Sequence, residues 1–193
     1  MTDITPFFQK INTYTTLSPE AEADWRSIIR PNSYDKGEDF IRMGSVPRNV
    51  AFVVKGLFAQ SYIADSGEAV IKYFFPEGRI AGSIPATLTR SESLFSISAL
   101  EATTVLEYNY HEFKRLVTLH ASIATFYIHY MERHWIIDKE PYEISLRHDT
   151  AKSRYDDFIK NYPELLKRVK KHHIASYLGI TPTQMSRIFF ANK

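Results

Sequence analysis

The first half of the sequence shows short apolar runs separated by glycine-containing turns. Three runs rich in β-branched and aromatic residues occupy positions 50–54, 57–63 and 69–75, and a fourth at 102–108 alternates moderately. Six of the seven glycines stand at 37–82. Short strands at this spacing predict an all-β barrel, sandwich or roll. Asp65-Ser66-Gly67 predicts a hairpin turn, because glycine takes the positive φ that such turns need.

Helical signals flank these runs. Ser18-Pro-Glu-Ala-Glu predicts the start of a helix, because serine caps it, proline suits its first turn and acids favour its positive end. Beyond residue 110 glycine nearly disappears and helical periodicity dominates. It predicts helices over 111–119, from about 121, and over 150–160. Pro141 is expected to kink or break the middle helix near Glu140.

The middle helix carries an apolar stripe. Its residues recur every seven positions, as Ile123, Tyr130, Ile137 and Ile144. This spacing is typical of a coiled coil. The stripe could pack on the chain's own β-roll or on a twofold mate. Because the stripe is long and the helix joins two predicted domains, we favour the mate and expect a homodimer through the helix around 121–140.

The strongest local signal is His-Ile-Ala-Ser-Tyr-Leu-Gly-Ile-Thr-Pro-Thr-Gln-Met-Ser-Arg-Ile-Phe-Phe at 173–190. Ile174 and Leu178 share one helical face. Gly179 supplies the left-handed residue that ends a helix. Thr181 can cap the next helix, and the proline after it fits the first helical position. The segment therefore predicts two short helices around a tight turn.

The second of these helices presents a polar face that suits the major groove of DNA. Its outward side chains are predicted to be Thr183, Gln184, Ser186 and Arg187. An arginine can donate two hydrogen bonds to guanine, and a glutamine can address adenine. The helix start at Thr181 can hold a phosphate, and upstream Lys170 and Lys171 can contact the DNA backbone. The alternative is an ordinary helical hairpin with capping residues.

Composition and charge narrow the function. From residue 164 onward six Lys or Arg stand against one acid, whereas the rest of the chain is slightly acidic, which is typical of one end meeting a polyanion. The absence of cysteine excludes disulfide scaffolds, iron–sulfur clusters and thiol nucleophiles. Polar residues interrupt the N-terminus, and no apolar run approaches a membrane span, so we expect a cytoplasmic protein.

An enzyme is the first rival to a DNA-binding function. No histidine precedes His111, so the predicted roll offers no imidazole for a cupin-type metal site. No Gly-x-Ser-x-Gly or phosphate-binding glycine loop occurs, and the pair Asp156-Asp157 belongs to a predicted solvated helix face. We therefore expect no catalytic residue, no metal and no cofactor. Haem stays open, although the histidines are interpreted as surface or seam residues of helices.

Residues 174–188 resemble the helix-turn-helix of the Crp/Fnr superfamily of bacterial transcription regulators, and the order of elements agrees over nearly the whole chain. The resemblance implies an α+β fold. Its parts would be a cyclic-nucleotide-binding-like antiparallel β-roll (a double-stranded β-helix with flanking helices) at 1–119, a dimerisation helix at 120–147 and an all-α helix-turn-helix domain at 148–193. Because the sequence ends at Lys193, we expect a branch without a β-hairpin wing.

The resemblance also implies roles for residues and partners. Arg187 would read a base, while Thr181 and Gln184 would touch phosphate. A homodimer would bind a palindromic operator in double-stranded DNA, and RNA polymerase would be a partner. Pro182 and Thr183 replace the charged residues of other members at the remaining base-reading positions, so the operator sequence does not carry over. The alternative is a ligand-sensing or protein-interaction module that has lost DNA binding.

The effector pocket departs from the family pattern. Members of the cyclic-AMP type hold the ribose with a Glu after a glycine and the phosphate with an Arg. Here Ser83 follows Gly82, and Ser93 stands near the position of the Arg. A buried phosphate without its cation loses a pair worth about 1.5–3 kcal/mol, so we expect cyclic AMP to bind weakly or not at all. Tyr73, Gly82, Ser83 and Ser93 are candidate lining residues for another small-molecule effector.

Overall fold

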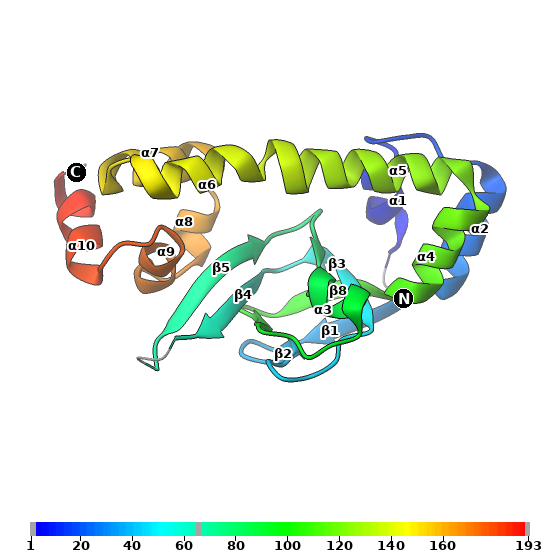
Figure 1. The fold of residues 1–193 in the computed structure, drawn as a ribbon, viewed down its shortest axis with the longest axis horizontal. Coiled ribbons are helices and arrows are strands. Elements are labelled where there is room, and N and C mark those ends of the chain that lie inside the picture. Colours follow the sequence, from blue (N-terminus) through cyan, green and yellow to red (C-terminus); the bar gives the residue numbers. More distant parts are fainter. Residues whose placement is uncertain (1–2, 65–66, 192–193) are drawn as a thin grey trace.

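The structure, a computed structural model, describes residues 3–64 and 67–191. Two four-stranded antiparallel sheets form its centre (Figure 1). The first contains, in spatial order, β1 (Arg30–Tyr34), β8 (Thr103–Asn109), β3 (Asn49–Lys55) and β6 (Ile80–Ala81). The second contains β2 (Asp39–Ile41), β7 (Ser96–Ala99), β4 (Phe58–Ile63) and β5 (Ala69–Phe75).

Both sheets contribute to one apolar interior, so they form a β-roll. Ala51, Val53 and Val105 of the first sheet meet Phe58 and Ile97 of the second. The strands predicted around 50–54, 57–63, 69–75 and 102–108 are confirmed as β3, β4, β5 and β8. The sequence pattern missed β1, β2, β6 and β7, which are short or largely exposed. The turn residues Asp65 and Ser66 lie outside the described residues.

Helices close one end of the roll. They are α1 (Thr5–Ile11), α2 (Pro19–Ile28), α4 (Tyr110–Leu119) and α5 (Ala121–Met131). Their core is aromatic: the ring of Trp25 lies 4.9 Å from that of Phe113 and 5.1 Å from that of Phe126, measured between centroids. The predicted cap of α2 is confirmed, because Ser18 Oγ accepts from Ala21 N at 3.2 Å. A short helix, α3 (Ile84–Thr89), follows β6.

The helix expected to kink or break near Glu140 is irregular just before that residue, but it does not end there. After α5 the chain makes a π-helical turn, Glu132–Ile137, and continues as α6 (Lys139–His148) in one rod across the molecule (Figure 1). The irregularity lies before the proline, where Asp138 N donates to Arg133 O at 2.9 Å. Pro141 stands in the first turn of α6, a position where a missing N–H is tolerated.

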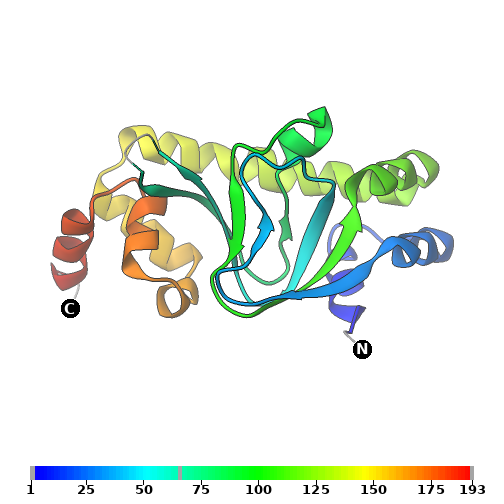
Figure 2. The same cartoon turned by 90° about the horizontal axis from the view of Figure 1, so that it is seen from below.

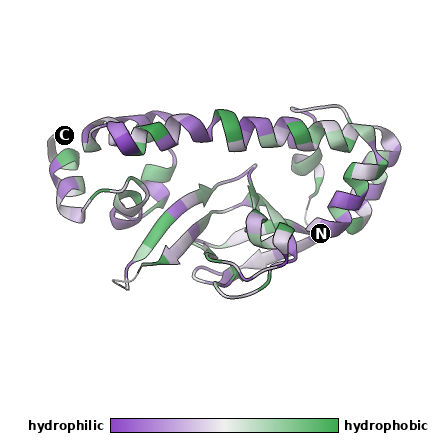
Figure 3. Cartoon of the chain, in the orientation of Figure 1, coloured by the Kyte–Doolittle hydropathy of each residue, from purple (hydrophilic) through white to green (hydrophobic). Residues whose placement is uncertain are grey.

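The apolar stripe of this rod divides between two environments. Ile123 is buried in the aromatic core, and Tyr130 packs against the same core. Ile137 and Ile144 are 56% and 58% exposed. Hydrophobic positions recur along the middle of the rod (Figure 3). The first half of the stripe therefore serves the chain's own fold, and the second half is largely exposed in the described part of the chain.

The C-terminal part is helical. It comprises α7 (Ala151–Asn161), α8 (Leu165–Arg168), α9 (Lys171–Tyr177) and α10 (Pro182–Ala191). Thr150 caps α7 by accepting from Ser153 N at 3.2 Å. These helices share a core with the outer face of β4 and β5, including Ala59, Ile71 and Phe74. Figure 2 shows the C-terminal helices beside these two strands. Among the described residues no helix is long and apolar enough to cross a membrane.

Candidate functional site

The helices α9 and α10 are joined by a tight turn, as predicted for this segment. Gly179 has a φ of +63°, the left-handed conformation that ends α9. Ile180 N then donates to Ala175 O at 3.0 Å. Thr181 and Gln184 form a reciprocal capping box. Gln184 N donates to Thr181 Oγ1 at 3.2 Å, and Thr181 N donates to Gln184 Oε1 at 2.9 Å.

The capping box restricts how Gln184 can contact DNA. Its side-chain oxygen is already bound to the start of α10, so only its amide nitrogen remains available to a partner molecule. Thr183, Ser186 and Arg187 are exposed on the same helix, whereas Met185 is buried beneath them. The polar face predicted from the sequence is thus presented outward.

A positive edge adjoins this face. Lys170 and Lys171 are exposed at the start of α9. The Nζ atom of Lys171 lies 3.4 Å from the ring centroid of Phe189, a cation–π contact between α9 and α10. Partial burial, together with the charges of His172 and Lys170, lowers the pKa of His173. At neutral pH the positive charge of this edge therefore comes from its lysines rather than from His173.

The sequence reasoning missed how α9 is held. Strand β5 is an edge of its sheet, so its outward N–H and C=O groups need other partners. Ser176 on α9 supplies both: its Oγ accepts from Ile71 N at 2.9 Å and donates to Ala69 O at 3.2 Å. Tyr142 on the long helix adds a bond to Tyr177 O at 2.7 Å.

A second attachment joins the C-terminal helices to the roll through Arg168. Its guanidinium binds both oxygens of Glu77, at 2.8 and 2.9 Å, and Glu101 Oε1 at 2.5 Å. It also donates to Gly56 O at 2.9 Å, while Gly56 N donates to Glu77. A Cβ at Gly56 would lie 2.5 Å from Thr103 Oγ1, so only glycine fits this junction. We call this group the Arg168 clamp.

The candidate effector residues fall into two places. Ser83 and Ser93 are buried and hydrogen-bonded to each other at 2.9 Å, and Ser93 Oγ also donates to Phe95 O at 2.7 Å. A Cβ at Gly82 would lie 2.8 Å from a methyl group of Val50. These three residues are close together, and their polar groups are satisfied within the fold.

Tyr73 lies instead in a polar network beneath the long helix. Its hydroxyl accepts from Arg79, which also contacts His134 Nδ1 at 2.8 Å. Asp138 Oδ2 lies 2.7 Å from the same nitrogen, and Tyr14 OH binds the other nitrogen at 2.7 Å. Burial and the charge of Arg79 lower the pKa of His134 to about 4. Of the two interpretations of His134, as a surface or a seam residue, the surface one is wrong: its side chain is 9% exposed and packs between the long helix and the rest of the chain.

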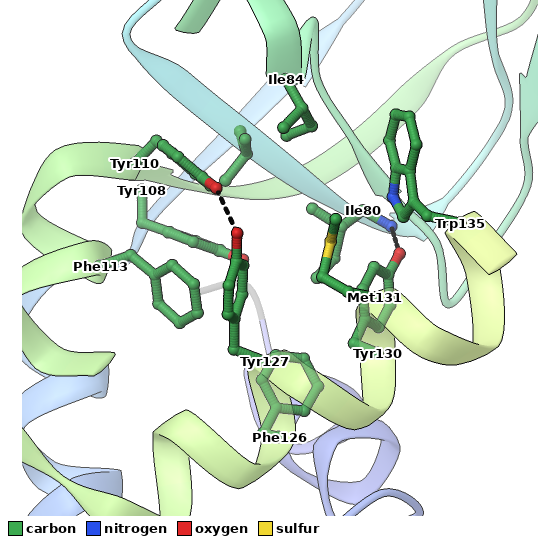
Figure 4. A pocket seen from close by; sticks show the side chains of 11 residues that line it. Ile80, Ile84, Tyr108, Tyr110, Phe113, Phe126, Tyr127, Tyr130, Met131 and Trp135 are labelled. Carbon is green, nitrogen blue, oxygen red and sulfur yellow. Dashed lines mark hydrogen bonds between the residues drawn. The ribbon is translucent and has the colours of Figure 1, made fainter. Parts of the chain in front are cut away.

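An apolar cavity lies between α5 and the roll. It has a volume of about 40 Å³, room for little more than water. Tyr110 and Tyr127 face each other across it with a hydroxyl–hydroxyl distance of 3.0 Å, and Tyr130 OH accepts from Ile80 N at 3.1 Å (Figure 4). This cavity does not offer the volume that a nucleotide requires.

The β-roll was compared with known protein families. Residues 31–120 match the family model of the cyclic nucleotide-binding domain. The roll has the fold of a cyclic nucleotide-binding domain. A comparison with curated proteins finds no match.

Solved structures extend this likeness beyond the cyclic nucleotide-binding roll. FixK2 from Bradyrhizobium japonicum has a TM-score of 0.70 at 17% identity, over 85% of this chain and 84% of that one. The c-di-GMP responsive global regulator CLP of Xanthomonas campestris has a TM-score of 0.70 at 12% identity, over 90% and 91%. A regulatory subunit of a cAMP-independent protein kinase A from Trypanosoma brucei gives 0.57 at 14%, over 74% and 50%. At these identities the likeness is one of fold.

Proposed function

We propose that the protein is a DNA-binding transcription regulator of the Crp/Fnr type, and not an enzyme. The observation that carries the proposal is α10: Thr183, Ser186 and Arg187 form an exposed polar face on a capped helix, next to an edge of exposed lysines. A helix of this kind fits the major groove, with Arg187 reading guanine and the start of the helix facing phosphate. RNA polymerase would be a further partner of a bound activator.

The proposed regulator acts as a homodimer. Exposed apolar side chains on the long helix, among them Ile128, Ile136, Ile137 and Ile144, are the surface that a second copy would cover. A twofold mate would place two copies of α10 on successive half-sites of a palindrome. Ile137→Glu is expected to convert the dimer to a monomer in analytical ultracentrifugation. A dimer that survives this change would show that another surface joins the copies.

The part of the proposal that concerns an effector follows from the buried Ser83–Ser93 pair. Ser83 and Ser93 bind each other and provide no cation for a cyclic phosphate. We therefore infer that cyclic AMP binds weakly or not at all. Isothermal titration calorimetry tests this inference, and binding below millimolar concentration would contradict it.

The direct test of function is selection from a pool of random duplex DNA. Wild type, Arg187→Ala and the matched charge control Arg26→Ala, on distant α2, are compared at low and moderate salt. Wild type and the control should enrich the same palindrome, with half-sites about one helical turn apart. Arg187→Ala should lose preference at one base in each half-site, at a cost of about 1–3 kcal/mol.

The second candidate function is a protein-interaction module with this fold. The likeness to a kinase regulatory subunit favours keeping this candidate, because that protein carries the same roll in a different kind of assembly. If neither wild type nor Arg26→Ala enriches any sequence, the DNA-binding proposal fails. A protein-interaction module is then the remaining candidate function.

A further inference from the structure

An open groove lies on the roll next to the Ser83–Ser93 pair, and Ser93 is one of the residues that line it. It has a volume of about 480 Å³, within the range of small-molecule sites. The segments that line it are the loop after β2, the end of β4 and the loop between α3 and β7. Its apolar side chains are Met43, Tyr62, Ile63, Leu94 and Phe95.

These side chains are unusually exposed for their size. Leu94 is 74% exposed, and Met43, Tyr62 and Ile63 are also open to solvent. An isolated exposed leucine needs no explanation, but several large apolar side chains around one concavity mark a binding surface. The groove therefore has the character of a site for an apolar body.

A β-bulge places a cation beside this groove. In the pairing of β4 with β5, Gln60 faces Tyr73 and Ser61 faces Ile71, so Lys72 is the extra residue between them. Bulges re-aim side chains and occur next to functional sites. The Nζ atom of Lys72 lies 4.2 Å from the ring centroid of Phe95, which lines the groove.

The ammonium of Lys72 has no acidic partner in the described part of the chain, where every ion pair within 4.0 Å joins other residues. Partial burial and the positive charge of Lys139 on α6 lower its pKa. Lys139 is paired with Glu143 at 3.0 Å. Lys72 is thus a cation held on an aromatic ring, next to a like charge and without a counter-ion among the described residues.

We propose that the groove binds an amphipathic monoanion, with its apolar chain along Leu94, Tyr62 and Ile63 and its carboxylate at Lys72. Glu92 also lines the groove and disfavours a second negative charge on the ligand. The groove's few polar groups offer little to a ribose or a base. The role of this ligand as an effector rests on the proposed function as a regulator. Binding of the ligand to the groove does not depend on that function.

The test is calorimetric titration of the whole protein, below micelle concentrations, with hexanoate, octanoate, decanoate and neutral decanol. Each buried methylene strengthens binding about fourfold, so affinity should rise along the series. Decanoate should bind at least about tenfold more tightly than decanol, because one charge-assisted bond is worth that much. Lys72→Met should abolish this difference, and the matched control Lys55→Met should preserve it.

Two further arms complete the test. Leu94→Asp, at a position that is 74% exposed, should weaken decanoate binding, and thermal unfolding is used to check that the variant is folded. Vesicles of anionic phospholipid distinguish a membrane surface from a free carboxylate. The proposal is overturned if decanoate fails to bind, if decanol binds equally well, if Lys72→Met has no effect, or if only vesicles bind. DNA selection without ligand reports on α10 alone, so failure of the proposed function is separately visible.

Discussion

Removing the guanidinium of Arg168 should loosen the C-terminal helices from the roll. Arg168→Met keeps much of the side chain's apolar stem but deletes bonds to Glu77, Glu101 and Gly56 O, all between 2.5 and 2.9 Å. It also leaves two carboxylates near each other without their cation. Breaking the Arg168 clamp should therefore lower the free energy of unfolding by more than breaking an ordinary surface ion pair.

The magnitude follows from the burial of the clamp. The side chain of Arg168 is 24% exposed, between the exposed pairs that contribute about 0–1 kcal/mol and the buried ones that cost about 3–5 kcal/mol to break. We expect a loss of about 2 kcal/mol. For a chain of this size that corresponds to a fall in Tm of about 4–8 °C.

The assay combines thermal unfolding with hydrogen exchange. The amide of Ile71 is the reporter, because its hydrogen bond to Ser176 exists only while α9 is docked on β5. In Arg168→Met this amide should exchange faster, while amides in the β3–β8 ladder should not change. The matched control is Arg26→Met, which breaks the exposed pair with Glu22 and should cost less than about 1 kcal/mol.

The clamp also predicts a dependence on pH. Burial alone would raise the pKa of Glu77, but bonds from Arg168 and from Gly56 N lower it overall. A carboxyl whose folded pKa lies below its unfolded pKa stabilises the fold above the unfolded value, near 4.5, and loses that contribution as pH falls through the folded value. Arg168→Met should weaken this acid dependence. If the variant unfolds within about 0.3 kcal/mol of wild type and Ile71 stays protected, the clamp does not hold the helices.

Three further predictions concern other groups. Because the pKa of His134 is lowered to about 4, the unfolded chain binds the extra proton between about pH 6.5 and 4. The free energy of unfolding of wild type should therefore fall as the pH is lowered from about 6.5 to 4, and that of His134→Gln should fall less. Identical pH profiles of urea unfolding for the two proteins would contradict this prediction. Gln184→Ala should destabilise α10 by about 1 kcal/mol, whereas Gln184→Glu should retain the capping box, as measured by thermal unfolding. Ser176→Ala leaves Ile71 N without its partner and should cost about 1–2 kcal/mol, with faster exchange of that amide; unchanged exchange would show that water replaces the hydroxyl.

Local rules were sufficient for much of this molecule. Ser18 and Thr150 cap their helices because a side-chain oxygen reaches an amide three residues ahead, and no distant contact is needed. Gly179 ends α9 because its left-handed φ is open to glycine whatever surrounds it. The four main strands and the turn between α9 and α10 followed from such patterns.

Some features depended on neighbours that local rules do not name. Pro141 does not end the long helix, because it stands in the first turn of α6, after the π-helical segment. The apolar stripe of the long helix has the same seven-residue spacing along its whole length. Only its first half packs against the aromatic core, so Ile123 is buried and Ile144 is exposed. His134 follows an ordinary helical spacing, but its pKa is lowered by burial and then by the charge of Arg79 from a distant turn.

The candidate sites divide in the same way. The exposed face of α10, including Arg187, could be predicted because helical periodicity decides which side chains point inward. The effector region could not: Tyr73 and Ser83 are near in sequence but belong to separate networks. The docking of α9 on β5 joins residues 105 positions apart, Ile71 and Ser176. Only tertiary packing decides such a contact, because a free strand edge accepts whichever donor and acceptor the fold brings to it.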